Sequence, residues 1–220
     1  MPGAFNDPKR DYTMDIPCSG VILAGGRNSR FGGREKAFLS VGGKLLFERI
    51  YGVCRPLFDE LILVTNNPGA YLRWDLHIVT DLFAVRSSLT GIHAGLFYAS
   101  NPYIFVVACD TPFLRPEIVS CMLEAIDERF DAIMPETAKG REPLCAAYAR
   151  RCLPAVERSL EKNLLKIQRV FRPGRIRAVA EARLRREDPE LISFFNINTP
   201  QDLDAAERML ADVETEERKS

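Results

Sequence analysis

The sequence has little that would place the protein in or across a membrane. No apolar run approaches the roughly 20 residues that a bilayer-spanning helix needs. Residues 1–17 mix Asp, Lys and Arg and contain no apolar core of the kind found in secretory signals. We therefore expect a cytoplasmic protein that does not enter membranes, with residues 1–17 as a flexible N-terminal extension.

Net charge is also absent, because 30 basic and 30 acidic residues cancel. Without a net field, the chain is not expected to bind nucleic acid or a membrane surface. Only two histidines occur, His77 and His93, and none of the six cysteines forms a Cys-x-x-Cys pair, which argues against a zinc site. We expect the cysteines to be buried, reduced thiols.

What the chain does contain is enough apolar sequence for one ordinary domain. Its 220 residues are 46% hydrophobic, and we expect one domain over 18–211 followed by a charged tail at 212–220. Apolar runs predict strands at 20–24, 61–64, 77–79, 103–108, 131–134 and 144–149; helical spacing predicts helices at 44–57, 88–100, 115–128 and within 151–170. Alternating buried strands and helices favour a three-layer α/β/α, Rossmann-like fold with a mostly parallel sheet.

The most informative stretch is Leu23-Ala-Gly-Gly-Arg-Asn-Ser-Arg-Phe-Gly-Gly-Arg-Glu-Lys36, directly after the first predicted strand. Glycines let backbone N–H groups approach an anion, and the four cations of this stretch could neutralise it. The pattern predicts a cradle for a nucleoside triphosphate. The alternative is a glycine-rich surface turn with a solvated basic face.

Two common phosphate loops do not fit this stretch. A Walker A loop needs Gly-Lys-Ser/Thr, whereas Gly32 is followed by Gly-Arg-Glu. A dinucleotide-binding loop needs an acidic residue at the end of the second strand, and here that strand ends in Thr65-Asn66-Asn67. The loop is therefore neither a kinase-type P-loop nor an NAD site.

Polar residues follow several of the predicted strands. Asn66, Asp81 and Asp110 each come after an apolar run, as Gly25 does. Ligands of parallel α/β sheets gather at the carboxyl ends of the strands, so we expect these residues to converge. Asp110 suits a Mg²⁺ ligand, although it could instead cap the helix near Pro116 or close a turn. Asn66 and Asp81 offer polar groups to a base or ribose, and Asn66 fits a turn equally well.

The glycine-rich stretch resembles the signature of the short nucleotidyltransferases, and within them that of the molybdenum cofactor guanylyltransferases. The resemblance lies in Leu-Ala-Gly-Gly at 23–26, followed by Arg30, Gly32 and Lys36. Gly25 favours the guanylyl branch of the family, because the cytidylyl branch more often has Leu-Ala-Ala-Gly.

Two further motifs resemble the same family. Cys109-Asp110-Thr-Pro-Phe-Leu is similar to a family motif whose aspartate holds the metal. The stretch from Phe195 to Leu203 is similar to Phe-x-Asn-x-Asn-Thr-Pro-x-Asp-Leu, which closes the family's domain. The resemblance therefore runs from about residue 20 to about residue 210.

The resemblance implies a nucleotidyltransferase domain that transfers GMP from GTP to the terminal phosphate of molybdopterin with Mg²⁺. It implies catalysis by Lys36, Arg30 and Asp110, with Arg30 on the triphosphate, on the incoming phosphate or in a structural ion pair. Asn196 and Asn198 would contact molybdopterin or make structural hydrogen bonds. Further partners would come from cofactor biosynthesis or molybdoenzyme maturation. GTP would contact Leu23, Ala24, Gly25, Gly26, Lys36, Asn66, Asp81 and Asp110.

One segment departs from the family pattern, and another is compatible with either a functional or a structural role. Residues 86–91, Arg-Ser-Ser-Leu-Thr-Gly, stand where the family has Gly-Pro-Leu-x-Gly, so the path of that loop is open. Residues 141–144, Arg-Glu-Pro-Leu, suit either an acceptor contact or a turn before a strand.

The C-terminal motif also has a structural side. Thr199, Pro200 and Asp202 predict a capped helix start, because each is a favoured residue at its position of a helix N-terminus. Asn196 and Asn198 alternate with apolar residues, which predicts a strand with both amides on one face.

Other functions remain open from the sequence. The nearest alternatives are transfer from CTP in place of GTP and transfer to a sugar or alditol phosphate. An alternative of another class is a non-catalytic nucleotide- or cofactor-binding module.

Overall fold

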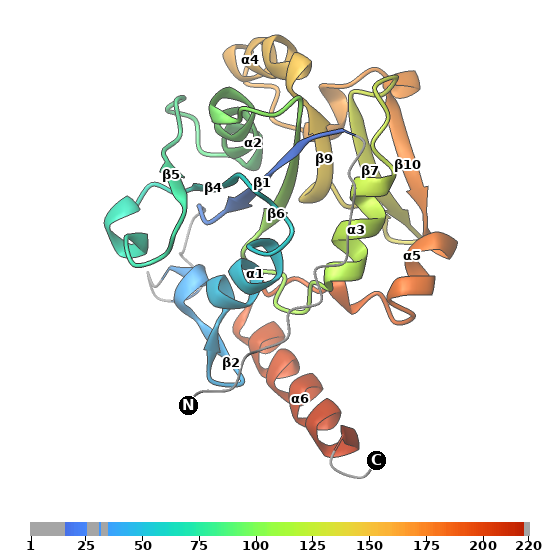
Figure 1. Ribbon diagram of the computed structural model, residues 1–220. Helices are drawn as coiled ribbons and strands as arrows, with labels where there is room; N and C mark the ends of the chain where they lie inside the picture. The colour runs from blue at the N-terminus through green and yellow to red at the C-terminus, as the bar shows by residue number, and fades with distance from the viewer. Residues whose placement is uncertain (1–15, 26–30, 32–34, 218–220) are drawn as a thin grey trace, which may run out of the picture.

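One sheet organises the chain. The computed structural model describes residues 16–25, 31 and 35–217, with side chains as far as Ala211. The strand order is β10-β7-β9-β6-β1-β4-β5, with the short β8 paired to β7 (Figure 1). The strands are β1 (Cys18–Leu23), β4 (Leu61–Val64), β5 (His77–Val79), β6 (Tyr103–Ala108), β7 (Ala132–Thr137), β8 (Gly140–Arg141), β9 (Cys145–Ala149) and β10 (Ile176–Ala180).

The two central strands decide where polar loops can gather. Every residue of β1 and β6 is buried, which suits their unbroken apolar sequences. β1 pairs in parallel with β4 and with β6, in a register that sets Leu23 opposite both Val64 and Ala108. The three strands therefore end at the same edge, and the loops that follow them start side by side.

Helices cover both faces of this sheet, as expected for a three-layer α/β/α fold. On one face lie α1 (Leu46–Cys54), α3 (Pro116–Glu124) and α5 (Glu181–Glu187); on the other, α2 (Ser88–Tyr98) packs against α4 (Leu153–Glu161) (Figure 1). Close packing on the second face requires glycine at position 95, where a Cβ would lie 2.9 Å from Val21 Cγ1. The fold class predicted from the sequence is confirmed.

The strand β9 runs against the parallel arrangement that its apolar sequence suggested. It is antiparallel to both of its neighbours, β6 and β7. The reason is the short connection from β7 to β9, which spans 138–144 and includes β8. A crossover between parallel strands takes a dozen residues or more, so a connection of this length returns the chain in the opposite direction.

A second, smaller core lies outside the main sheet. The hairpin β2 (Ser40–Val41) and β3 (Lys44–Leu45) turns through Gly42 and Gly43, whose φ angles of +57° and +71° favour glycine. Because β3 occupies 44–45, α1 begins at Leu46 and is shorter than the helix predicted over 44–57. Helix α6 (Pro200–Glu217) packs on the hairpin, and both carboxylate oxygens of Glu207 accept from the Gly42 N–H. α6 continues beyond residue 212, where we expected a charged tail to begin.

Short 3-10 helices complete the described chain: η2 (Lys36–Phe38), η3 (Pro68–Tyr71), η4 (Arg150–Cys152), η5 (Ile167–Arg169), η6 (Pro173–Arg175) and η7 (Ile192–Phe194). All six cysteines are free and buried, as predicted. Across the part of the chain that the structure describes, every helix is too short or too polar to span a bilayer.

Candidate active site

A pocket of about 580 Å³ opens at the edge where β1, β4 and β6 end. Its volume lies within the roughly 300–1,000 Å³ typical of small-molecule sites. The four residues predicted to converge at this edge all line it, namely Gly25, Asn66, Asp81 and Asp110. Four further predicted site residues line the same pocket, namely Leu23, Ala24, Lys36 and Asn198.

Three side chains from distant parts of the sequence meet in this pocket. The Lys36 ammonium, at the start of η2, donates to Asp110 Oδ2 at 2.8 Å and to Asn198 Oδ1 at 3.0 Å. The side chains of Lys36 and Asp110 are 22% and 19% exposed, so a ligand in the pocket can reach both. Asp110 does not cap a helix, because α3 begins after Arg115 without a side-chain cap.

Asp110 has the features of a metal ligand. Its second oxygen, Oδ1, is buried and has no hydrogen-bond partner among the described residues. A buried carboxylate oxygen without a donor is costly, and a cation would offset that cost. The described ranges contain no cluster of three or more His, Cys, Asp or Glu that could hold a metal by itself. Mg²⁺ is often held by one or two carboxylates together with substrate phosphates, and Asp110 fits that arrangement.

The C-terminal motif positions Asn198 by a capping box. Asp202 Oδ2 accepts from the backbone N–H groups of Asn198 and Thr199, both at 2.8 Å, while Thr199 Oγ1 accepts from the Asp202 N–H at 3.2 Å. These bonds hold the pKa of Asp202 below its ordinary value, chiefly through the Asn198 N–H. The predicted helix cap at the start of α6 is confirmed.

The strand predicted around the two asparagines is wrong. Residues 195–198 form no strand, because their backbone bonds to the site rather than to a sheet: the Ile197 N–H donates to the Asp110 carbonyl at 2.9 Å. Asn196 turns away and donates to the Phe194 carbonyl at 2.9 Å, and it does not line the pocket. The structure therefore brings Asn198 to the site and leaves Asn196 in a local turn.

Asn66 and Asp81 form a second polar pair in the pocket. The Asn66 amide nitrogen donates to Asp81 Oδ2 at 2.8 Å. The pair lies after β4 and β5, which are neighbours and parallel, so the two loops leave the sheet together. This hydrogen bond holds the two side chains together, and the Asp81 carboxylate lies at the pocket wall.

Glu35 has a role in the site that was not predicted from the sequence. We treated it only as one residue of the glycine-rich stretch, yet it lines the pocket beside Lys36. Its oxygens accept from Asn67 Nδ2 at 2.6 Å and from the Tyr71 hydroxyl at 3.3 Å. Burial is the main cause that raises the pKa of Tyr71, which therefore stays a hydrogen-bond donor. Glu35 thus links the end of the glycine-rich stretch to the segment after β4. The feature of the sequence that could have indicated this role is that Glu35 is the one acidic residue among the basic residues of the stretch.

The beginning of the glycine-rich stretch is anchored in the sheet. The Ala24 N–H donates to the Val64 carbonyl at 3.0 Å, so this amide is used by the fold. Leu23 is buried, and its Cδ2 lies 3.0 Å from the position that a Cβ on Gly91 would take. Backbone donors for a phosphate can therefore begin only at Gly25.

Two predicted site residues, Gly26 and Arg30, lie outside the described residues. Most of the expected N-terminal extension, residues 1–15, does so as well. The roles predicted for Gly26 and Arg30 at the triphosphate therefore stay predictions.

The departure from the family pattern at 86–91 places a cation and a helix cap at the pocket wall. Arg86 and Ser87 line the pocket, and Ser87 Oγ accepts from the Thr90 N–H at 3.2 Å, which caps α2. Leu144, from the Glu-Pro-Leu segment before β9, also lines the pocket. Arg86 is a pocket cation that the sequence analysis did not predict.

A nucleotide-sized pocket at the carboxyl ends of parallel strands, with a glycine-containing loop, a lysine and a half-buried carboxylate, indicates a nucleotide-binding transferase of the α/β class. The family comparison agrees with this class, because the MobA-like NTP transferase domain matches residues 20–181. This chain belongs to that family, the one that the sequence motifs resemble.

Individual relatives support the same assignment. The chain is 44% identical over 189 residues to the molybdenum cofactor guanylyltransferase of Desulfosudis oleivorans, covering 86% of this chain and 94% of the relative. It is 38% identical to a probable molybdenum cofactor guanylyltransferase of Pelotomaculum thermopropionicum, covering 91% and 97%. The crystal structure of molybdopterin-guanine dinucleotide biosynthesis protein A from Archaeoglobus fulgidus matches with a TM-score of 0.76 and 31% identity, over 88% of this chain and 99% of the other.

Proposed function

We propose that this protein transfers GMP from GTP to the terminal phosphate of molybdopterin, forming the guanine dinucleotide cofactor and releasing pyrophosphate. One observation carries the proposal: Lys36 contacts both Asp110 and Asn198 inside the pocket at the strand ends. These three residues come from the motifs that resemble the guanylyltransferases, and relatives that bear that name cover most of the chain.

The reaction needs charge neutralisation and positioning more than proton transfer. An oxygen of the acceptor phosphate bonds to the α-phosphorus of GTP, and the bond from that phosphorus to the oxygen that bridges it to the β-phosphorus breaks. Because the attacking phosphate is already an anion, no general base is required. Lys36 would leave its partners to neutralise oxygens that gain charge in the transition state, which is the contribution a preorganised cation makes.

Asp110 would hold Mg²⁺ through its oxygen Oδ1, which has no donor among the described residues. When bound, the metal supplies positive charge to the triphosphate and the leaving pyrophosphate. Asp110 has a second task that needs no metal, because its Oδ2 holds the Lys36 ammonium in the pocket. This contact would keep the Lys36 ammonium close to the bound phosphates and out of solvent.

The base and the acceptor would lie on different sides of this cluster. Asp81 can accept from the N1–H and 2-amino donors of guanine, and Asn66 holds its carboxylate in place at 2.8 Å. Asn198, anchored by Asp202, offers an amide to the molybdopterin phosphate. Asn196 has no part in this proposal because its amide is engaged by the Phe194 carbonyl.

The test is pyrophosphate release from GTP with Mg²⁺ and molybdopterin, with and without bound molybdenum. Parallel reactions replace GTP by CTP and molybdopterin by a sugar phosphate. We expect turnover with GTP and molybdopterin, with CTP much poorer. Preference for CTP or for the sugar phosphate would reject the guanylyl assignment, and GTP binding without pyrophosphate release would reject catalysis.

A further inference from the structure

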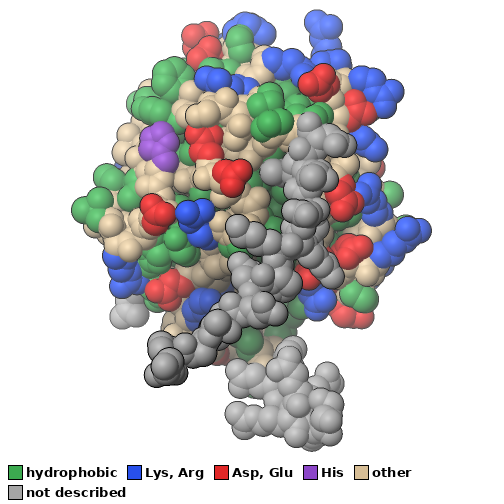
Figure 2. All heavy atoms as spheres, in the orientation of Figure 1, with side chains coloured by type: hydrophobic (Ala, Val, Ile, Leu, Met, Phe, Trp, Pro, Cys, Tyr) green, Lys and Arg blue, Asp and Glu red, His purple; other side chains and the backbone are tan. Residues whose placement is uncertain are grey.

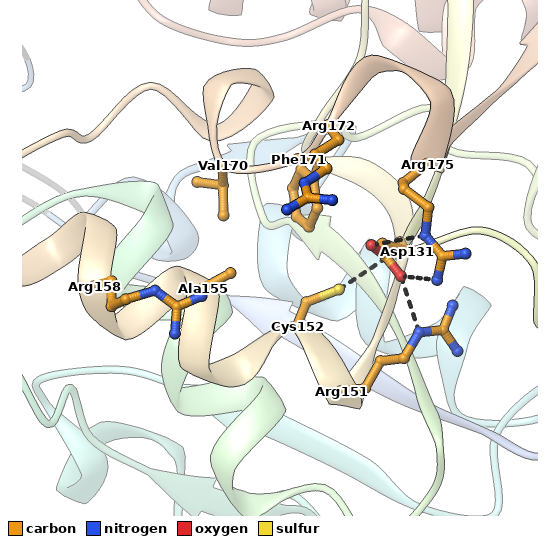
Figure 3. A pocket seen from close by; sticks show the side chains of 9 residues that line it. All are labelled: Asp131, Arg151, Cys152, Ala155, Arg158, Val170, Phe171, Arg172 and Arg175. Atoms are coloured by element: carbon orange, nitrogen blue, oxygen red, sulfur yellow. Dashed lines mark hydrogen bonds and ion pairs between the residues drawn. The ribbon is translucent and has the colours of Figure 1, made fainter.

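A second pocket, of about 340 Å³, lies away from the proposed active site (Figure 3). It is bounded by η4 and α4 on one side and by residues 170–175 on the other, and it shares no lining residue with the first pocket. Arg151 at its wall donates to the hydroxyl of Tyr103, the first residue of β6, at 3.5 Å. Asp110 lies two residues beyond the other end of that strand, so about 17 Å of β6 separates the two sites.

Arginine dominates the wall of this pocket. Four guanidinium groups line it, from Arg151, Arg158, Arg172 and Arg175, against a single carboxylate, Asp131. The formal charge of the lining is therefore three positive, although the whole chain is neutral. In Figure 2, Lys and Arg side chains lie along the top of the view, where Figure 1 places α4, with Asp and Glu side chains among them.

Asp131 holds two of the four arginines in place. Its Oδ1 accepts from Arg151 Nε at 2.9 Å and from an Arg175 terminal nitrogen at 2.7 Å, and its Oδ2 accepts from Arg175 Nε at 3.1 Å. The hydrogen bonds from Arg175 are the largest cause that keeps the pKa of Asp131 below its ordinary value. The carboxylate therefore stays charged and fixes both guanidinium planes at the pocket wall.

The other two arginines have no such partner. Among the residues described, the side chains of Arg158 and Arg172 make no hydrogen bond or ion pair, although their backbone carbonyls accept from Lys162 and Arg175. They approach from opposite sides, Arg158 from α4 and Arg172 from the loop before η6 (Figure 3). Like charges placed around one cavity repel each other, and an anion between them would remove that cost.

The floor of the pocket is apolar and well packed. Phe171 is buried and stacks on Tyr148 of β9, with ring centroids 5.4 Å apart. Cys152 is also buried, and burial is the main cause that raises its pKa to about 12, so the thiol stays neutral and adds no negative charge. Phe171 thus fastens the loop that carries Arg172 to the sheet, which gives the arginines a fixed frame.

We propose that this pocket binds an oligophosphate anion of a small molecule, without a metal ion. Guanidinium groups bind phosphate oxygens in pairs through parallel N–H donors, which a lysine cannot do. Three surplus positive charges match a pyrophosphate or a nucleotide triphosphate chain, and the concave shape suits a small ligand more than a protein surface. The shared chemistry is the phosphoanhydride; free pyrophosphate and GTP are the two sources to be distinguished.

The experiment measures binding of inorganic pyrophosphate to the full chain by isothermal titration calorimetry, with EDTA present to remove divalent metals. The test variant is R158Q/R172Q, because both side chains are exposed and their loss should leave the fold intact. The matched control is R186Q, an exposed arginine of α5 outside the pocket. Thermal unfolding of each variant verifies that it is folded.

We expect metal-independent pyrophosphate binding by the wild type and by R186Q. Binding should be weakened about tenfold or more in R158Q/R172Q, because charge-assisted hydrogen bonds to phosphate are the strong kind and two cationic groups are replaced by neutral amides. K36A should retain this binding, which separates the second site from the proposed active site. Equal affinity in R158Q/R172Q and R186Q would overturn the proposal, as would a wild type that binds no pyrophosphate in EDTA.

Competition then identifies the source of the anion. If GTP displaces pyrophosphate from K36A in EDTA with similar affinity, the site accepts nucleotides; if only pyrophosphate and tripolyphosphate bind, it accepts the free anion. Either result supports an oligophosphate site. Because the measurement uses neither a metal nor turnover, a failure of the proposed transferase activity would not be mistaken for a failure of this site.

Discussion

The two pockets of this protein hold their cations in different ways. At the carboxyl end of β6, Lys36 is already engaged by Asp110 and Asn198. At the other end of β6, two arginines share one carboxylate, and two more face the cavity without a partner among the described residues. An anion that takes the Lys36 ammonium at the first site must displace these partners, whereas at the second site Arg158 and Arg172 can bind an anion without giving up a partner.

Under the proposed function, the same contrast would explain why a divalent metal is needed at the first site only. When a triphosphate takes the Lys36 ammonium, the Asp110 carboxylate loses its cation and would face the phosphates unpaired. A divalent ion on Asp110 removes that repulsion. In the second pocket, called the arginine pocket here because Arg151, Arg158, Arg172 and Arg175 line it, Asp131 would keep its pairs with Arg151 and Arg175 when an anion binds. No metal is then needed to offset the charge of Asp131.

Removing the lysine should have the strongest effect at the first pocket. K36A should lower kcat for pyrophosphate release by about 10²–10³-fold, because one preorganised donor to a developing charge contributes about that much. K162A, which removes an exposed lysine after α4, is the matched control and should be fully active. Steady-state turnover at saturating GTP measures both. If K36A were as active as K162A, the pairing of Lys36 would have no catalytic purpose and the contrast between the pockets would fail.

Removing the charge of Asp110 should have the next strongest effect. D110N keeps the size of the side chain and can still accept from Lys36, but it loses the charge that would attract a divalent ion. We expect about a hundredfold lower activity and a higher Mg²⁺ requirement, since a bound metal contributes several kcal/mol. Titrating Mg²⁺ against turnover measures this, with D204N, at an exposed position of α6, as the control. Identical Mg²⁺ profiles for the two variants would place the metal elsewhere.

A weaker effect is expected where Asn198 is anchored. D202A removes the acceptor of the Asn198 and Thr199 N–H groups and should destabilise the protein by about 1 kcal/mol. The KM for the acceptor should rise, with little change in the KM for GTP. Denaturant unfolding and the two KM values check this. Equal increases in both KM values would show that Asn198 is not specific to the acceptor.

The same cap gives a pH dependence with a defined sign. Because the folded-state pKa of Asp202 is lowered, its contribution to stability is present above the pKa of the unfolded carboxyl, about 4. That contribution is lost as the pH falls below this value and through the folded pKa. Unfolding free energies measured from pH 6 to pH 3 should therefore decline less in D202A than in the wild type. Parallel declines would mean that the cap does not stabilise the folded protein.

The weakest effect is expected in the arginine pocket. D131N removes its carboxylate charge, so metal-free pyrophosphate should bind about two- to fivefold more tightly. Stability should fall by about 1 kcal/mol or less, because the ion pairs with Arg151 and Arg175 are partly exposed. Calorimetry and thermal unfolding measure the two effects, and kcat should not change. Weaker pyrophosphate binding would mean that Asp131 orients the arginines more than it opposes the anion.

Local patterns in the sequence were enough to predict much of the framework. The runs 61–64 and 103–108 match β4 and β6 residue for residue, because an unbroken apolar run bounded by polar residues is typical of a buried strand. The start of α6 at Thr199 could be predicted because the two residues of a capping box, Thr199 and Asp202, lie only three positions apart in the sequence. The convergence of Asn66, Asp81 and Asp110 followed from the rule for parallel strand ends.

Other features depended on contacts that no local pattern contains. Lys36 contacts Asp110 and Asn198, which lie 74 and 162 positions further along the sequence. Strand register and the hydrogen bond from the Ile197 N–H to the Asp110 carbonyl bring these residues together in space. The reversed direction of β9 came from a short connection between strands. The arginine pocket could not be predicted from the sequence, whose net charge is zero. Its four arginines come from two segments, 151–158 and 172–175, which are brought together only by packing against the sheet. Local chemistry thus determined the elements and their ends, whereas the sheet decided which of those ends became neighbours.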